Sequence, residues 1–217
     1  MARFFDPRSA DEAGQDARLN APATERNRGV ILELLEGCLR RDGVLLEVAS
    51  GTGEHAAHMA PRLKPLYWQP TDIDDRHLAS IDAWAHHAGS ENLLPARRFN
   101  VLEDDWHFPD LPARISTVAA INLIHIAPWP VAEALIKGAG STLEAGDILF
   151  MYGPYKQKGA HTAPSNAAFD LSLKRQNPDW GVRDLEAVKD LADKAGFTNL
   201  DIVGMPANNF SLIFTKG

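Results

Sequence analysis

One acidic residue and two glycines stand where a strand would end, and together they could bind a cofactor. The stretch Val44–His55, VLLEVASGTGEH, places Glu47 in an apolar run and follows it with the small residues of Ala49–Gly53. Glycine permits tight turns and lets a ligand approach the backbone, and a helix that starts in such a loop offers free N–H groups. Asp72 follows 19 residues after Gly53, where a second strand would end. A carboxylate at that point could accept hydrogen bonds from both hydroxyls of a ribose.

Two classes of cofactor are compatible with this loop. Residues Gly51–Ala56 satisfy the dinucleotide fingerprint G-x-G-x-x-A, which binds a pyrophosphate. Glu47, however, would repel a pyrophosphate and would favour a ligand that carries a positive ammonium or sulfonium group. A closing pair of strands, described below, also fits the second class better. Taken alone, the glycine loop is equally compatible with a simple turn.

A second group of residues, later in the chain, could hold a substrate or move a proton. His125 and Trp129 follow an apolar strand in the segment Ile124–Trp129. His125 could act as a base, and Trp129 could form an aromatic wall for a substrate. The same two residues are equally compatible with a histidine at the edge of the core and a packing tryptophan.

The segment Tyr152–Asp170 is polar and lacks an apolar period, so we expect a long irregular loop. Such loops are more often functional than not. Tyr155 and His161 are assigned to substrate contact or proton removal, because a phenol and an imidazole can both orient or deprotonate a nucleophile. Residues assigned to substrate binding are Trp129, Tyr152, Asn166 and Asp170.

The composition is that of an ordinary globular protein and argues against several functions. With 45% hydrophobic and 24% charged residues, the 217 residues suit one α/β domain with a substantial core. The net charge of −7 argues against a general nucleic-acid binder, which needs a clustered basic surface. The single cysteine, Cys38, leaves no internal disulfide, and no run approaches the roughly 20 apolar residues of a membrane span. The start of the chain, MARFFDPRSADEAG, has no secretory signal. We expect a cytoplasmic monomer or homodimer that acts on a small-molecule substrate, with no nucleic-acid or membrane partner.

No metal site is expected. His55 and His58 share a helix face, but no third ligand lies within reach in the sequence. Asp72, Asp74 and Asp75 are explained by one ribose ligand and by an acid at a helix N-terminus.

Apolar periodicity places these residues on alternating strands and helices. Strands are predicted at 44–48, 66–70, 96–101, 115–123, 147–152, 200–205 and 210–214. Helices are predicted at 28–40, 52–63, 75–87, 131–143 and 182–195, and 153–178 is predicted to be irregular. Residues 1–24 are polar and aperiodic, and we expect a flexible leader or a lid within a single domain spanning 1–217. Near-continuous apolar strands indicate a mostly parallel sheet covered on both faces, whereas the last two strands are too close for a crossover helix and must be antiparallel.

The string EVASGTG resembles the first motif of class I S-adenosylmethionine-dependent methyltransferases, in which an acid precedes a G-x-G-x-G loop. Ala49 stands where the first glycine usually stands. Alanine is a small replacement, provided that its φ is negative. Nearly the whole chain is similar to the domain-of-unknown-function 938 family, also described as methyltransferase-like protein 26. The strings that carry this resemblance are Arg26-Asn27-Arg28, EVASGTGEH, WQPTDID, INLIHIAPW, YGPYKQKGAHTAPSNAAFD, NPDWGVRDLE and MPANNF.

The resemblance implies a Rossmann-like class I methyltransferase fold, with a seven-stranded, mostly parallel sheet, a C-terminal antiparallel strand pair and helices on both faces. It implies S-adenosylmethionine as cofactor and S-adenosylhomocysteine as product, and it names no substrate. Carried over by position, Glu47, Ala49, Gly51 and Gly53 would surround the methionyl part of the cofactor, Asp72 would bind the ribose and Ile73 would pack on the adenine. Asn100 and Val101 would lie near the adenine amino group, and Asn122 and Leu123 beneath the sulfonium.

Arg26 and Asn27 precede the first predicted helix and could close over the cofactor, or they could be a solvated helix start. Asn122 is also compatible with an amide that satisfies backbone groups at the end of a strand. Methyl transfer depends mainly on alignment, so the absence of an obvious catalytic triad is no objection. We predict methyl transfer to a small molecule. The alternatives are a non-catalytic cofactor-binding or interaction protein, other chemistry on the same cofactor and, disfavoured by Glu47, an NAD-dependent oxidoreductase.

Overall fold

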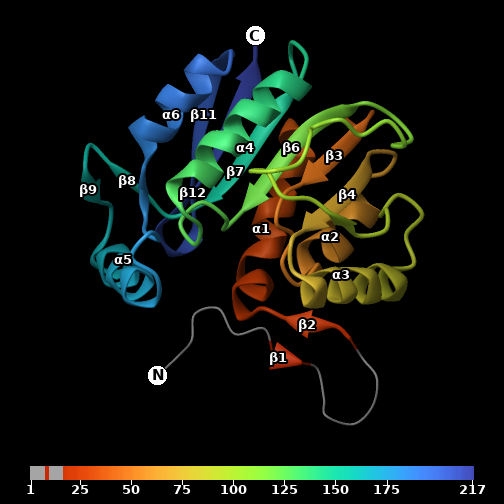
Figure 1. Ribbon diagram of the computed structural model, residues 1–217, viewed down its shortest axis with the longest axis horizontal. Coiled ribbons are helices and arrows are strands. Elements are labelled where there is room, and N and C mark those ends of the chain that lie inside the picture. The colour runs from red at the N-terminus through yellow and green to blue at the C-terminus, as the bar shows by residue number, and fades with distance from the viewer. Residues whose placement is uncertain (1–7, 10–16) are drawn as a thin grey trace. The chain divides into compact units, whose positions relative to one another are not determined.

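The computed structural model describes residues 8–9 and 17–217 (Figure 1). Most of the predicted leader or lid, residues 1–7 and 10–16, lies outside the described residues. The chain forms two compact units. Unit 1 runs to Asn100 and includes Asp110–Ile115, and unit 2 comprises Val101–Pro109 and Ser116–Gly217.

Seven of the described strands form one sheet in the order β11-β12-β7-β6-β3-β4-β5. Their bounds are β3 Val44–Glu47, β4 Tyr67–Asp72, β5 Arg97–Arg98, β6 Ile115–Ile121, β7 Ile148–Gly153, β11 Phe197–Met205 and β12 Asn209–Lys216. β3 pairs with β4, β4 with β5, and β6 with β7 in parallel, whereas β12 is antiparallel to both β7 and β11. The predicted fold class is therefore confirmed, including the closing antiparallel pair. Every residue of β3, β6 and β7 is buried, which explains their near-continuous apolar sequence.

The helices of unit 1 are α1 Pro22–Cys38, α2 Glu54–Met59, the short 3₁₀ helix η1 Ala60–Arg62, and α3 Asp75–Ala88. The predicted start of the first helix at Arg28 is wrong, because α1 begins six residues earlier, with a proline in its first turn. Its buried face includes Thr24 and Asn27 beside the apolar Ile31, Leu32 and Leu35. Two polar residues on the buried face concealed the first part of the helical period.

Two further predictions for unit 1 need correction. The third strand, predicted at 96–101, is only the two residues of β5, because Phe99 leaves the ladder after donating its N–H to the Asp72 carbonyl. Two short strands also lie outside the main sheet. β1 (Arg8–Ser9) and β2 (Leu19–Asn20) pair antiparallel just ahead of α1.

Unit 2 holds α4 Trp129–Thr142, α5 Pro164–Gln176, α6 Leu185–Lys194 and the 3₁₀ turn η2 Pro206–Asn208. A small second sheet has the order β10-β8-β9, with bounds β8 Tyr155–Gln157, β9 Ala160–His161 and β10 Arg183–Asp184. The helix predicted at 182–195 therefore begins only at Leu185, capped by the Asp184 side chain. Across the part of the chain that the structure describes, no helix combines the length and the apolar character that crossing a membrane would require.

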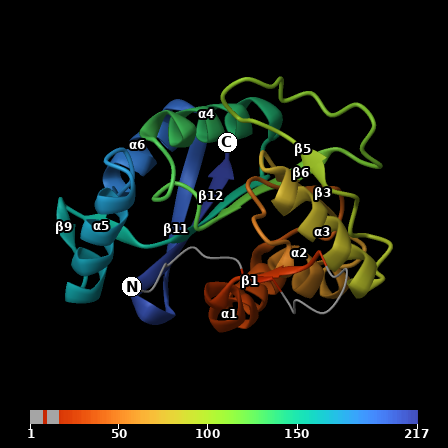
Figure 2. The same cartoon turned by 60° about the horizontal axis from the view of Figure 1, so that its bottom comes forward.

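The prediction that 153–178 is irregular is wrong. This segment contains β8, β9 and α5, and Figures 1 and 2 show α5 beside β9. The buried residues of α5 are Asn166, Asp170 and Leu173, which have helical spacing. Because two of the three are polar, the segment lacks the apolar period by which a helix is usually recognised.

The buried amide of Asn166 gives a test of this polar packing. Its Nδ2 donates to the Thr162 hydroxyl at 3.2 Å and to the Asn208 carbonyl at 2.9 Å, which ties α5 to the β11–β12 hairpin. Asn166→Ala should destabilise the protein by about 1–3 kcal/mol, the range for leaving a buried polar group unpaired. The midpoint of urea unfolding measures the loss, with the exposed Gln176→Ala on the same helix as the control. Equal midpoints for the two variants would contradict the tie.

Candidate functional site

The loop after β3 has the left-handed backbone that glycine favours. Gly51 and Gly53 have φ values of 59° and 87°, and Gly53 caps the start of α2. A Cβ on Gly53 would lie 2.7 Å from the Ile81 backbone, so a glycine there lets the loop pack directly on α3. The two glycines therefore meet different needs, since Gly51 has open space around it and requires only the conformation.

Ala49 departs from the expectation of a negative φ. Its φ is 57°, in the left-handed region. An L-residue there costs about 1–2 kcal/mol because Cβ approaches the following carbonyl oxygen. The expected negative φ at Ala49 is therefore wrong, and alanine is not a harmless replacement for the first glycine. The loop carries strain at this residue.

Glu47 ends β3 as a buried carboxylate. The side chain is 1% exposed, and Trp68 Nε1 donates to Glu47 Oε2 at 3.0 Å. Burial raises the pKa of Glu47 to about 7, with a small contribution from the nearby Asp72 charge, while the Trp68 hydrogen bond opposes the rise. Glu47 therefore changes its charge near neutral pH and would respond to a positive ligand.

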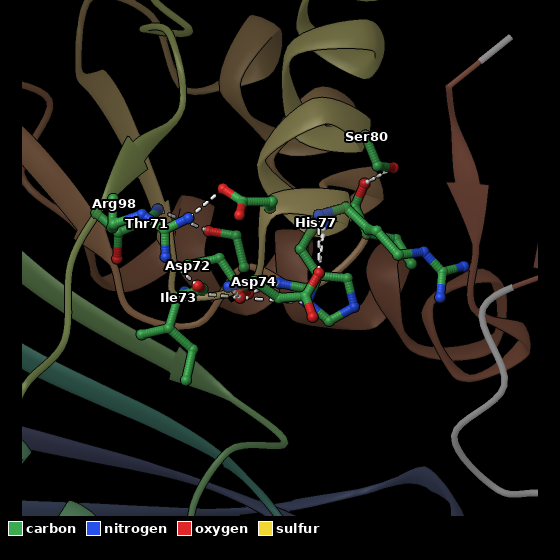
Figure 3. A network of polar contacts seen from close by, with 12 residues as sticks. Thr71, Asp72, Ile73, Asp74, His77, Ser80 and Arg98 are labelled. Atoms are coloured by element: carbon green, nitrogen blue, oxygen red, sulfur yellow. Dashed lines mark hydrogen bonds and ion pairs between the residues drawn. The ribbon is translucent and has the colours of Figure 1, made fainter. Parts of the chain in front are cut away.

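Asp72 joins the ends of β3 and β4 and is saturated with donors on one side (Figure 3). Oδ2 accepts the Gly51 N–H at 2.9 Å. Oδ1 accepts the N–H groups of Ile73 and Asp74 at 2.8 and 3.0 Å and meets His77 Nδ1 at 3.2 Å. Each carboxylate oxygen has about two accepting positions. The three donors crowd Oδ1, whereas the Gly51 N–H takes only one position on Oδ2, so one position on Oδ2 stays open to a further donor.

The residues around Asp72 differ in exposure. The Ile73 side chain is 60% exposed, an unusual value for an isoleucine, while its carbonyl accepts from Arg98. Arg98 also pairs with Asp75. Asn100 and Val101 follow β5 and are half-buried. An exposed apolar surface thus lies beside the carboxylate that the sequence assigns to a ribose.

A strap of residues 17–21 also holds the loop, and the sequence analysis missed it. Ser80 Oγ donates to the Thr52 carbonyl at 2.7 Å and accepts the Leu19 N–H at 2.8 Å. Glu54 Oε2 accepts the Ala21 N–H at 2.5 Å and the Thr52 hydroxyl at 3.2 Å. Both Ser80 and Glu54 are buried, so the strap and the loop share two enclosed polar links. No spacing signal announces a lone serine on the buried face of a helix.

Arg26 and Asn27 lie on different faces of α1. Arg26 is exposed, whereas Asn27 is buried and its Oδ1 accepts the His55 Nε2–H at 2.8 Å. Burial lowers the pKa of His55 to about 3, and the charges of His58 and Arg28 lower it further. His55 is therefore neutral and packed. Among residues 17–217, no three His, Cys, Asp or Glu side chains gather as a metal site would need.

In unit 2, Asn122 and His125 follow β6. Asn122 has a φ of 58°, which asparagine tolerates, and its N–H donates to the Tyr152 carbonyl at 2.8 Å. Leu123 is half-buried. His125 is buried with its ring edge on Phe169, at 5.7 Å between centroids. A Cβ on Gly153 would lie 3.1 Å from His125 Nδ1, so that glycine makes room for the ring.

The pKa values of His125 and Tyr155 do not suit a general base at neutral pH. Burial, with the Arg183 charge, lowers the pKa of His125 to about 3. Neither ring nitrogen of His125 has a hydrogen-bond partner among the described residues. Burial raises the pKa of Tyr155 above its usual value, so its phenol stays protonated at neutral pH and is no general base. Tyr152, on β7, is buried as well.

Asp170, on α5, is a buried acid at the centre of a cluster of basic side chains. Oδ2 lies 2.8 Å from Lys174 Nζ, 3.5 Å from Lys156 Nζ and 3.3 Å from His161 Nε2, and Oδ1 accepts the Val182 N–H at 2.7 Å. Burial alone would raise the Asp170 pKa, but these donors and charges lower it overall. His161 Nδ1 is buried without a partner among the described residues. Two residues assigned to the substrate, His161 and Asp170, are thus in direct contact.

Arg183 is a further residue that the sequence analysis missed. Its Nε donates to the Ile124 carbonyl at 3.0 Å, and its Nη2 donates to the carbonyls of Ala127 and Asp179 at 2.6 and 2.7 Å. The guanidinium lies over the Trp129 ring, 5.7 Å from its centroid. Arg183 therefore holds the loop that carries His125. An arginine just before a helix cap has no distinctive spacing, which is why it escaped notice.

Comparison with known proteins places the chain in a family. The sequence model of the family described as "Protein of unknown function (DUF938)" matches residues 18–216. The chain belongs to this family. The sequence resemblance to the DUF938 family is thereby confirmed.

Solved structures similar to this DUF938 chain include several methyltransferases. An O-methyltransferase family protein from Burkholderia thailandensis has 17% identity and a TM-score of 0.75, over 90% of this chain and 56% of its own. Human N-acetylserotonin methyltransferase, solved in complex with SAM, has 13% identity and a TM-score of 0.72, over 90% and 53%. An O-methyltransferase family 2 protein from Planctomyces limnophilus, solved with apigenin, has 19% identity and a TM-score of 0.70, over 96% and 67%. The DUF938 chain spans little more than half the length of the first two. At these identities the likeness shows the methyltransferase fold.

The strain at Ala49 predicts an unusual response to glycine. Ala49→Gly should be neutral or up to about 1 kcal/mol stabilising, because relief of the left-handed strain outweighs the added freedom of the unfolded chain. The matched control, Ala79→Gly on the exposed face of α3, should cost about 0.5–1 kcal/mol. Thermal unfolding of both variants measures the difference. An Ala49→Gly variant as unstable as the control would show that the loop is not strained.

The His77–Asp72 pair predicts a pH dependence of stability. The hydrogen bond to Asp72 raises the His77 pKa, against the opposing effect of burial. Its stabilisation is therefore complete below the unfolded pKa of about 6.5 and is lost as pH rises through the higher folded value. His77→Gln should cost most near about pH 5.5 and least near about pH 8.5. Urea unfolding at both pH values measures this, with His86→Gln as the control for removing an imidazole from α3. A cost that does not change with pH would contradict a charged pair.

Proposed function

We propose that this protein is an S-adenosylmethionine-dependent methyltransferase that acts on a small-molecule acceptor. The observation that carries the proposal is Glu47, a buried carboxylate whose pKa of about 7 lets it ionise for a positive ligand. It lies directly before a left-handed glycine loop at the carboxyl end of a parallel strand, which is where ligands bind in open α/β sheets.

Unit 1 supplies the groups that we assign to the cofactor. Glu47 and the loop Ala49–Gly53 bind the methionyl part, whose ammonium group complements the acid. Asp72 accepts one ribose hydroxyl on the remaining position of Oδ2, and the exposed Ile73 packs on the adenine. A dinucleotide is disfavoured, because its pyrophosphate would lie against the buried acid.

Residues of unit 2 are assigned to the acceptor: His125, Trp129, Tyr152, Tyr155, His161, Asn166 and Asp170. A neutral His125 offers a ring nitrogen as a hydrogen-bond acceptor, and the protonated Tyr155 offers a donor. Neither is a strong base at neutral pH. The arrangement therefore supports transfer by alignment to an acceptor that needs little help in losing a proton.

A non-catalytic cofactor-binding role is the second candidate. The pKa shifts of His125 and Tyr155 favour it, because neither side chain is a strong base at neutral pH. Turnover separates the candidates. Incubation with S-adenosylmethionine and fractionated metabolite extracts should yield S-adenosylhomocysteine in amounts that grow with time and with one fraction. Cofactor binding without any such product would support the binding role.

Calorimetry tests the cofactor assignment. S-adenosylhomocysteine should bind and NAD should not. The affinity for S-adenosylhomocysteine should rise by up to about tenfold per pH unit between about pH 6 and about pH 7.5. The reason is that a protonated Glu47 must lose its proton to bind the ammonium group. Glu47→Gln should weaken binding and remove this slope, while the exposed Glu36→Gln on α1 should retain both. NAD binding, or an unchanged slope in Glu47→Gln, would overturn the assignment.

A further inference from the structure

The guanidinium of Arg183 is fixed in place without a carboxylate partner. Three backbone carbonyls, those of Ile124, Ala127 and Asp179, accept its Nε and Nη2 hydrogens. Its Cζ lies over the Trp129 ring, 5.7 Å from the ring centroid. Among the described residues, no carboxylate oxygen lies within 4.0 Å of it. The positive charge is thus held in one geometry but is not neutralised by an adjacent anion.

The nearest buried acid is not free to supply that negative charge. Asp170 is engaged by Lys174, Lys156 and the Val182 N–H, with His161 as a fourth neighbour. Two lysines already exceed its single negative charge. A half-buried cation without a counter-ion is costly, and such groups are usually paired. Burial indeed lowers the Arg183 pKa, although the charges of Asp170 and Asp179 oppose the change.

One edge of the guanidinium remains available to a ligand. Nη1 has no hydrogen-bond partner among the described residues, and it is not fully enclosed by protein. Two of the three carbonyls that hold Arg183, those of Ile124 and Ala127, belong to the segment that contains His125. The Gly181 N–H also donates to the His125 carbonyl at 3.0 Å. A ligand on Nη1 would therefore bind beside the loop that carries the assigned acceptor residues.

We propose that Arg183 binds a carboxylate on the methyl acceptor, which makes the acceptor a small organic acid. The identification of the bound acid as the methyl acceptor rests on the proposed methyltransferase function. The binding of a carboxylate at Arg183 does not depend on the cofactor. A carboxylate is favoured over a phosphate because one unpaired positive charge matches one negative charge, and a dianion would keep an unpaired charge. A neutral analogue would leave the cation unpaired and bind weakly, so Arg183 determines specificity.

Benzoate and benzamide test the proposal, because they share a ring and differ in charge. Titrations with benzoate, acetate, benzamide and inorganic phosphate are followed by tryptophan fluorescence, with and without S-adenosylhomocysteine. In the wild type, benzoate should bind at least about tenfold more tightly than benzamide, and phosphate no better than benzoate. Arg183→Gln should remove the difference, whereas Arg175→Gln, which deletes an exposed arginine of α5, should preserve it. Equal binding of benzoate and benzamide, tighter binding of phosphate, or no saturable binding of either carboxylate would overturn the proposal.

A second measurement covers the case in which Arg183→Gln fails to fold, since Arg183 also holds the loop. In wild-type protein labelled with ¹⁵N arginine, benzoate should shift the Arg183 Nε–Hε signal saturably, and benzamide should not. Arg183→Lys keeps the charge without the planar donors. This variant should bind benzoate more weakly than the wild type does, but it should still bind benzoate more tightly than it binds benzamide. An unmoved Arg183 signal at saturating benzoate would assign the residue to loop packing alone. Loss of S-adenosylhomocysteine binding with intact benzoate binding would instead count against the proposed function only.

Discussion

The hydrogen bond from the Gly51 N–H to Asp72 is the constraint on which unit 1 depends. It joins the loops that follow β3 and β4, while the other oxygen of the same carboxylate organises its own turn through the N–H groups of Ile73 and Asp74. One buried acid thereby sets the relative positions of the glycine loop and the start of α3. Its distribution of donors leaves Asp72 able to accept a further hydroxyl without giving up its structural role.

Two of the buried acids of unit 1, Glu47 and Asp72, have different hydrogen-bond partners. Asp72 accepts four hydrogen bonds, one on Oδ2 and three on Oδ1. Glu47 has the Trp68 indole, and burial raises its pKa to about 7. Asp72 is therefore fixed by its hydrogen bonds, and Glu47 would respond to the charge of a ligand beside it. This division suits a ligand that has both a ribose and a positive group.

Polar packing organises unit 2. The buried face of α5 consists of Asn166, Asp170 and Leu173. The Arg183 guanidinium supports the loop after β6 by donating to the carbonyls of Ile124 and Ala127. Such packing is costly unless each group finds partners. It keeps charged and hydrogen-bonding groups inside a segment where a ligand can use them, as an apolar core could not.

The sequence by itself determined the alternating strands, the antiparallel closing pair and the association of the glycine loop with Glu47 and Asp72, because apolar runs and glycines report local backbone needs directly. Only the tertiary structure decided which polar residues are buried. α5, the strap on Ser80 and Glu54, and Arg183 all depend on partners distant in sequence, such as Thr52 for Ser80 and Ile124 for Arg183. The φ of Ala49 was also beyond the sequence, because the surrounding packing imposes a conformation that alanine does not choose alone. Local sequence patterns encode secondary-structure propensity, whereas contacts between residues distant in sequence decide which charged groups are paired.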